Sequence, residues 1–144
     1  MAGIIDTNIV TQVAFVVKDI VAAKKKFAEF LGVEPPEHFA TNKSPDNIVE
    51  GKPAPDVSAL LAFFNVGPNM AIELIQPNGA KSVWQDVLDQ KGEGFHHIAF
   101  NIKGMDEKVQ ACEEAGYKCA QRGKGYAYMD ATADLKCFLE LLGE

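Results

Sequence analysis

The segment Gln12–Ile20, with the sequence QVAFVVKDI, decides the fold because a close copy of it, HIAFNIKGM, follows at His97–Met105. The two segments share three identical pairs, which are Ala14 with Ala99, Phe15 with Phe100 and Lys18 with Lys103. A second pair of similar segments follows in the same order along the chain. These segments are MAIELI at Met70–Ile75 and CFLELL at Cys137–Leu142. Such self-similarity indicates two copies of one structural unit, about 10–76 and 95–142, within a single domain of 144 residues.

Each copy predicts the same order of elements, β-α-β-β-β. In the first copy we expect a strand over about Val10–Val17, a helix from the N-cap Asp19 to about Leu31, an irregular proline-rich stretch over 34–58, and strands over Ala59–Val66 and Met70–Ile75. The second copy predicts a strand over Phe95–Ile102, a helix over Met105–Ala115, and strands over Lys118–Arg122, Tyr126–Asp130 and Lys136–Leu142. A short helix over Lys81–Gln90 connects the copies. The sequence therefore predicts an α+β fold in which two tandem β-α-β-β-β modules form a curved mixed sheet around a cleft.

Four polar residues interrupt the apolar strands at repeat-equivalent positions, Gln12 with His97 and Glu73 with Glu140. Side chains alternate between the two faces of a strand, so each of the four points away from the bulky side chains that a helix should cover. Two half-sheets could bring these faces together around a common cleft. The same alternation sends His96 to the opposite face, so we leave it out of the predicted site.

A metal ion would explain the four residues together. A single glutamine or glutamate on a strand is usually a surface residue, and a single histidine is usually a hydrogen-bonded core residue. Isolated carboxylates in apolar strands, however, are costly unless they are paired or bound to a cation. One imidazole and three oxygen donors suit one divalent ion, Zn, Ni, Co, Mn or Mg, and leave about two octahedral positions for oxygens of a substrate.

The chain resembles the vicinal oxygen chelate superfamily, which includes glyoxalase I, methylmalonyl-CoA epimerase, extradiol dioxygenases and the bleomycin- and fosfomycin-resistance proteins. The resemblance covers about Val10 to Leu142, and the segments TQVAFVVKDI, MAIELIQPNG, GEGFHHIAFNI and FLELL carry it. It implies a homodimer, and a metal cleft whose ligands are those of one branch of glyoxalase I. Those ligands correspond here to Gln12, Glu73, His97 and Glu140.

The resemblance also implies a metal-dependent isomerase, epimerase or lyase of the glyoxalase I (lactoylglutathione lyase) or methylmalonyl-CoA epimerase type. Such an enzyme removes a proton next to a carbonyl and forms a metal-stabilised enediolate. Glu140 is the first candidate base, and Glu73 could serve the opposite face of the carbon. Glu50 lies at about the position of a catalytic carboxylate of the epimerases; its alternative is a solvated loop residue.

Two other functions stay open at this point. One is a non-catalytic protein that binds a small molecule, as bleomycin-resistance proteins do, although those proteins lack the metal ligands. The other is a thiol transferase of the fosfomycin-resistance type, whose members generally use two histidines and one glutamate.

We expect a small carbonyl or thioester substrate. By strand parity Tyr126 and Tyr128 share a face and could line the cleft, where Arg122 or Lys124 could meet an anionic group. Glyoxalase I proteins generally carry an arginine four residues after the first ligand, where it holds a glutathione carboxylate. Val16 occupies that position here and argues against glutathione.

Composition and charge limit the expected partners and cellular location of the protein. The net charge of −6 argues against nucleic acid or an anionic membrane surface as a partner. No apolar run approaches the ~18 residues of a membrane-spanning helix. The N-terminus lacks the pattern of a secretory signal. The three cysteines, Cys112, Cys119 and Cys137, show no C-x-x-C spacing and indicate reduced thiols in a cytoplasmic protein.

Overall fold

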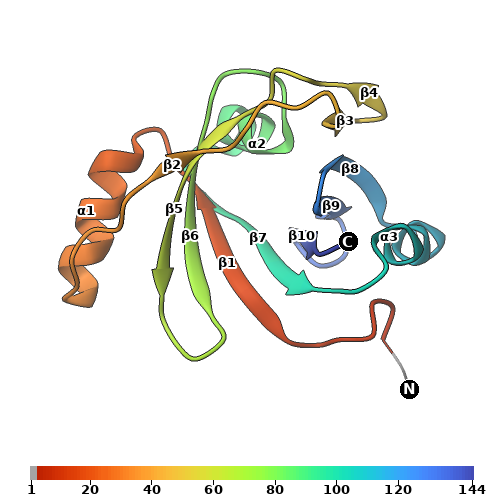
Figure 1. The fold of residues 1–144 in the computed structure, drawn as a ribbon, viewed down its shortest axis with the longest axis horizontal. Helices are drawn as coiled ribbons and strands as arrows, with labels where there is room; N and C mark the ends of the chain where they lie inside the picture. Colours follow the sequence, from red (N-terminus) through yellow and green to blue (C-terminus); the bar gives the residue numbers. More distant parts are fainter. Residues whose placement is uncertain (1–2) are drawn as a thin grey trace.

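Residues 3–144, which the computed structural model describes, form one mixed sheet of ten strands with three helices, an α+β fold (Figure 1). The strands are β1 (Val10–Val16), β2 (Phe39–Ala40), β3 (Ile48–Val49), β4 (Lys52–Pro53), β5 (Ala59–Asn65), β6 (Ala71–Pro77), β7 (Gly94–Asn101), β8 (Lys118–Gly123), β9 (Tyr126–Ala131) and β10 (Cys137–Leu142). The helices are α1 (Ile20–Leu31), α2 (Val83–Lys91) and α3 (Met105–Glu114). None of these helices is both long and apolar enough to cross a membrane.

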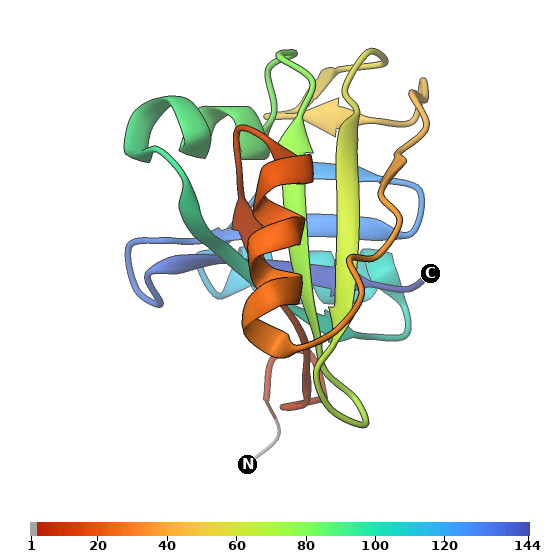
Figure 2. The ribbon, with the colours of Figure 1, turned by 90° about the vertical axis from the view of Figure 1, so that its left-hand side faces the viewer.

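The order of the strands confirms the predicted duplication. The sheet runs β2-β5-β6-β1-β7-β10-β9-β8-β3-β4. The second module contributes β7-β10-β9-β8, which is the order of β1-β6-β5-β2 in the first module read outward from the centre. In each module the first and last strands are parallel, and β1 joins β7 antiparallel between the modules. Figure 2 shows the strands of the first module running across those of the second, as expected for a strongly curved sheet.

Helices α1 and α3 cover the outer side of this sheet, at opposite ends of the molecule in Figure 1. Beneath α1, Ile20 and Ala28 pack with Leu74 of β6 and Phe64 of β5. Beneath α3, the side chains of Met105, Val109 and Cys112 pack with Met129 and Leu141. These two cores use the bulky strand faces that the alternation assigned to the helices, so the predicted facing of the strand residues in these cores is confirmed.

Helix α2 packs on the other face of the sheet. Its residues Val83 and Trp84 are buried with Ala14 and Val16 of β1 and with Tyr128 of β9. The strand alternation alone would assign every helix to the outer face, but α2 covers part of the inner face. The helix that links the two modules forms one wall of the space between them.

The proline-rich stretch 34–58, which the sequence predicts to be irregular, contains three short strands, β2, β3 and β4. Strands β3 and β4 form a hairpin whose turn residues, Glu50 and Gly51, have positive φ angles of 50° and 78°. Positive φ at both central residues is the geometry of a type I′ turn. This hairpin pairs with β8, so the first half of the chain extends the sheet of the second module.

The N-terminus of α1 provides a test of the local structure. The Asp19 carboxylate accepts hydrogen bonds from the backbone N–H groups of Val21 and Ala22, each at 3.1 Å. We expect Asp19→Ala to lower the free energy of unfolding by about 1 kcal/mol, because it leaves these N–H groups without their capping partner. Urea denaturation measures the change. Asp56→Ala, at an exposed loop aspartate, is the control and should leave the midpoint unchanged.

Candidate metal centre

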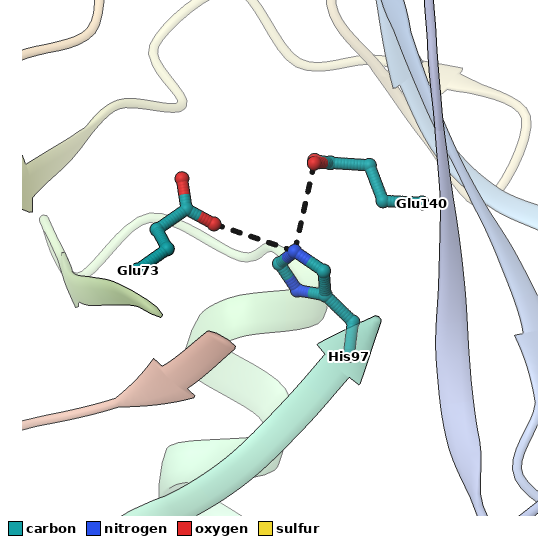
Figure 3. A group of neighbouring side chains, drawn as sticks. All are labelled: Glu73, His97 and Glu140. Atoms are coloured by element: carbon teal, nitrogen blue, oxygen red, sulfur yellow. Dashed lines mark ion pairs between the residues drawn. The ribbon is translucent and has the colours of Figure 1, made fainter. Parts of the chain in front are cut away.

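Three side chains from three strands converge on one point inside the molecule, as Figure 3 shows. Nε2 of His97 lies 3.3 Å from Oε1 of Glu73 and 3.5 Å from Oε1 of Glu140. One potential ligand atom from each residue lies within 4.8 Å of those of the others. All three residues belong to a single chain, while the homodimer expected from the sequence stays a prediction. The structure thus brings together three of the four predicted ligands within one chain.

The three residues of the cluster are buried, and one imidazole faces two carboxylates. Glu73, His97 and Glu140 are exposed by only 4%, 0% and 5%. Burial raises the pKa of Glu73 above its usual value, and the charge of Glu140 adds to this effect, although His97 opposes it. Burial also lowers the pKa of His97, but the carboxylates of Glu140 and Glu73 outweigh it and raise the pKa from 6.5 to about 9. Without another cation, one imidazole must therefore compensate two carboxylates.

The hydrogen bonding of the cluster leaves room for a cation. Three buried atoms make no hydrogen bond within residues 3–144: Oε1 of Gln12, Oε1 of Glu73 and Nε2 of His97. The last two lie 3.3 Å apart and form an ion pair only when His97 is protonated. A buried polar atom without a partner costs about 1–3 kcal/mol, and here three of them occur in residues of one predicted site. All three are electron-pair donors when His97 is neutral. An imidazole nitrogen with carboxylate and amide oxygens is a donor set that divalent ions accept, so these residues fit a bound metal.

Gln12 belongs to the same cleft as the cluster. Together with Glu73 and Glu140 it lines a cavity of about 280 Å³ on the inner face of the sheet. Aromatic and amide side chains form much of the remaining wall. The cavity is also lined by Thr41, Asn42, Asn47, Val57, Leu61, Phe63, Trp84, Lys124, Gly125, Tyr126, Tyr128 and Leu142. This size lies near the lower end of ligand pockets and suits the reacting part of a small molecule.

Strand alternation predicted that His96 points to the face opposite that of His97, and this prediction is wrong. Ala14 of β1 lies opposite His97 and Phe15 lies opposite Phe95, which leaves His96 as an extra residue in β7. This is a β-bulge, in which two residues oppose one and the side-chain alternation is interrupted. Both histidine rings consequently lie inside the protein, with their centroids 5.1 Å apart.

His96 is linked to His97 and to the start of α2. Its Nδ1 lies 2.8 Å from Nδ1 of His97, and its Nε2 lies 3.1 Å from the carbonyl oxygen of Val83. The ring stacks on Phe138 and meets the edge of Tyr128. Burial and the adjacent charge of His97 lower the pKa of His96 to about 3, although the bond to Val83 opposes this. His96 is therefore a neutral imidazole.

Tyr128 and Trp84 close the cleft on one side. Trp84 Nε1 donates a hydrogen bond of 3.0 Å to the Tyr128 hydroxyl, and the Tyr128 and His97 rings lie edge to face with centroids 4.9 Å apart. Burial raises the pKa of Tyr128 well above 10, and the charges of Glu140 and Glu73 raise it further. Tyr128 is thus a protonated phenol beside two carboxylates.

The other predicted substrate-binding residues divide between the cleft and its outside. Tyr126 and Lys124 line the cleft. Arg122 does not: its guanidinium pairs with Asp106 of α3 at 2.8 Å and lines two separate depressions. Glu50 also lies outside, at the tip of the β3–β4 turn, where its half-exposed carboxylate approaches Lys81 at 4.0 Å. The structure therefore brings neither Arg122 nor Glu50 to the cluster.

Sequence reasoning missed several residues that shape the site. Trp84 lies in the helix that the sequence predicts only as a connection between the two copies, and its indole N–H contact with Tyr128 has no signal in the sequence. Asn47 was hidden in the irregular stretch, yet its side chain accepts a hydrogen bond of 3.2 Å from the Tyr126 hydroxyl. For His96 the available signal was the adjacent pair of histidines. A second histidine in a buried strand must also be hydrogen-bonded, so it needs partners of its own.

The chain belongs to the family described as Glyoxalase/Bleomycin resistance protein/Dioxygenase superfamily, which matches residues 11–133. A curated relative, YqjC of Bacillus subtilis (strain 168), is 41% identical over 54 residues. That match spans 38% of this chain and 38% of YqjC, well under half the length of either protein. The family assignment therefore comes from the match over residues 11–133.

Solved structures share the fold over nearly the whole chain. Hypothetical protein BH1468 from Bacillus halodurans C-125 has a TM-score of 0.65 at 19% identity, covering 96% of this chain and 95% of that one. Methylmalonyl-CoA epimerase from Mycobacterium tuberculosis has a TM-score of 0.63 at 19% identity, covering 92% and 85%. A variant of the Streptomyces coelicolor epimerase, in complex with 2-nitronate-propionyl-CoA, scores 0.66 at 16% identity, covering 95% and 98%. At such identities the likeness establishes the fold alone.

The buried cluster predicts an unusual response of stability to metal. We expect metal-free Glu73→Gln to be at least as stable as the metal-free wild type, because it removes one buried charge. A divalent ion at a hundred times its Kd should stabilise the wild type by about 2.7 kcal/mol and the variant by much less. Thermal or urea unfolding with and without Zn, Ni, Co, Mn or Mg measures both effects.

The surface substitution Glu34→Gln is the matched control, since Glu34 is exposed, and it should keep the full metal effect. The metal assignment would be overturned if none of the five ions stabilised the wild type. A strong loss of metal-free stability in Glu73→Gln would instead assign this carboxylate a structural role.

Proposed function

We propose that this protein is a metal-dependent isomerase, epimerase or lyase that removes a proton from the carbon next to a carbonyl. The observation that carries the proposal is the buried convergence of Glu73, His97 and Glu140, together with three buried atoms, in Gln12, Glu73 and His97, that make no hydrogen bond within residues 3–144. Membership of the family and the fold shared with methylmalonyl-CoA epimerases support it. We assign Gln12, Glu73, His97 and Glu140 as the ligands of one divalent ion.

The residues of the cleft suit this chemistry. A divalent cation held by the four residues would polarise the substrate carbonyl and lower the energy of the negative oxygen that develops when the α-proton leaves. Glu140 and Glu73 approach His97 Nε2 from different strands, β10 and β6, so a substrate bound at the ion could meet a carboxylate from either side. Trp84 and Tyr128 exclude water from one side of this space, which strengthens every electrostatic interaction in it.

We assign proton transfer first to Glu140 and then to Glu73. Both carboxylates are buried within the cluster, and a positioned carboxylate can serve as a general base. The Tyr128 phenol, which stays protonated, can donate a hydrogen bond to a neighbouring anionic oxygen. Two carboxylates on opposite faces are what an epimerase needs, whereas a glyoxalase-type isomerisation can use one.

Solvent exchange tests the proposal. In D₂O, the metal-loaded protein should wash deuterium into the α-carbon of a substrate drawn from acyl-CoA thioesters and thiol hemithioacetals, followed by mass spectrometry. Glu140→Gln should reduce this exchange by about a hundredfold to ten-thousandfold, because it removes a general base but keeps an oxygen donor. Metal content of the variant, measured in parallel, separates loss of the base from loss of the ion.

The outcome with separated epimers distinguishes the two reaction types. If Glu73 and Glu140 serve opposite faces, Glu73→Gln and Glu140→Gln should each lose exchange with a different epimer. If metal-loaded wild type bound these compounds without any exchange, the protein would be a binding protein rather than an enzyme. Metal below about 0.1 equivalent after both analysis and titration would end the proposal altogether.

Lys124 is the cation of the cleft lining, and we propose that it meets an anionic group of the substrate. Its exposure limits the energy of such an ion pair to about 1 kcal/mol. Lys124→Ala should therefore raise KM by up to about fivefold for an anionic substrate, with kcat unchanged, and added salt should reduce the difference. Lys118→Ala, an exposed lysine at the other end of β8, is the control. An equal effect of both substitutions would assign the change to overall charge.

A further inference from the structure

We infer that His96 is a positioning residue, which holds the ring of His97 so that its Nε2 presents a lone pair to the ion held by Glu73 and Glu140. The inference rests on the proposed metal site and adds a residue that strand alternation excluded. It starts from two short contacts of His96, to the Val83 carbonyl oxygen and to Nδ1 of His97.

The positions of the protons follow from what each partner can accept. The Val83 carbonyl oxygen can only accept, so Nε2 of His96, 3.1 Å away, carries a proton and donates it. A neutral imidazole has one N–H, so Nδ1 of His96 carries a lone pair. The contact of 2.8 Å between the two Nδ1 atoms then requires that His97 Nδ1–H donates to His96. A neutral His97 in this arrangement has its lone pair on Nε2.

The surroundings of His96 keep this arrangement in place. The ring is 2% exposed and stacks on Phe138 with centroids 5.1 Å apart and planes inclined by 14°. Tyr128 meets it edge to face. An imidazolium at His96 would be a costly buried charge in this apolar setting. Packing therefore favours the neutral form of His96, and the Val83 carbonyl selects its tautomer.

A ring held in this way should bind metal better than a free one. Partners that fix the second nitrogen of a metal-bound histidine typically account for about ten- to a hundredfold in metal affinity. His97 Nε2 already faces both carboxylates at 3.3 and 3.5 Å, so no rotation of the ring is needed for binding. Without the acceptor on His96, the buried Nδ1–H of His97 would lose its partner, and the opposite tautomer would block Nε2.

Two substitutions separate positioning from packing. His96→Phe keeps a ring on Phe138 but removes the acceptor, whereas His96→Asn keeps an oxygen close to the position of Nδ1. We expect His96→Phe to weaken zinc binding by about ten- to a hundredfold in a chelator competition, and His96→Asn to restore most of the affinity. His38→Phe, at a partly exposed histidine bonded to Lys24, is the control and should bind zinc as the wild type does.

Nuclear magnetic resonance of the zinc-loaded protein gives a readout independent of activity. In ¹⁵N-labelled wild type, the His97 ring should bind zinc through Nε2 and show an Nδ1–H protected from exchange with water. In His96→Phe this Nδ1–H should lose its protection. Unfolding curves of the metal-free variants show whether each one folds.

The results distinguish failure of this inference from failure of the proposed function. If wild type takes up no metal, the proposed function fails. If wild type binds zinc and a folded His96→Phe binds it equally well, or if the wild-type Nδ1–H is absent, then only the assignment of His96 is overturned. If His96→Phe does not fold, the zinc affinity of His96→Asn and the wild-type spectrum still decide the question.

Discussion

Two glutamate side chains buried against one imidazole nitrogen are the interaction on which the arrangement of this protein depends. Removing a carboxylate from water costs several kcal/mol, and a second one nearby adds repulsion to that cost. His97, itself fully buried, lies within 3.5 Å of both but can compensate only one of them. The strands that carry these side chains must therefore be held firmly by packing elsewhere, which the two outer cores under α1 and α3 provide.

Duplication explains how such a costly cluster is assembled. Glu73 and Glu140 occupy the last strands of the two modules, and these strands flank the central β1–β7 pair in the sheet. Because the modules repeat with the same alternation, one residue placed inward in each copy gives two that face each other. The repeat therefore determined both the predicted sheet and the predicted ligands, and the structure brings Glu73, His97 and Glu140 together as expected.

Features that break the repeat could not be predicted in this way. An extra residue in β7 reverses the facing of His96, and strand alternation carries no record of such a residue. The β3–β4 turn holds Glu50 away from the cleft, since two positive φ angles turn the chain at its tip. Arg122 lies outside the cleft, where it pairs with Asp106 of α3, a contact between distant segments that no local pattern encodes. Local backbone geometry thus places His96 and Glu50, whereas Arg122 is placed by a contact between segments that are distant in the sequence.

Helix α2 belongs to neither repeat, yet it sets the polar contacts around the cluster. The backbone N–H of Val83 donates to the side-chain oxygen of Gln121 at 3.0 Å, and its carbonyl accepts from His96. Gln121 in turn donates to the Tyr126 hydroxyl, and Trp84 donates to that of Tyr128. One turn of the linker thus orients groups on β7, β8 and β9. The repeated strands supply the clustered imidazole and carboxylate groups, while the unrepeated linker contributes Trp84 to the wall of the cleft beside them.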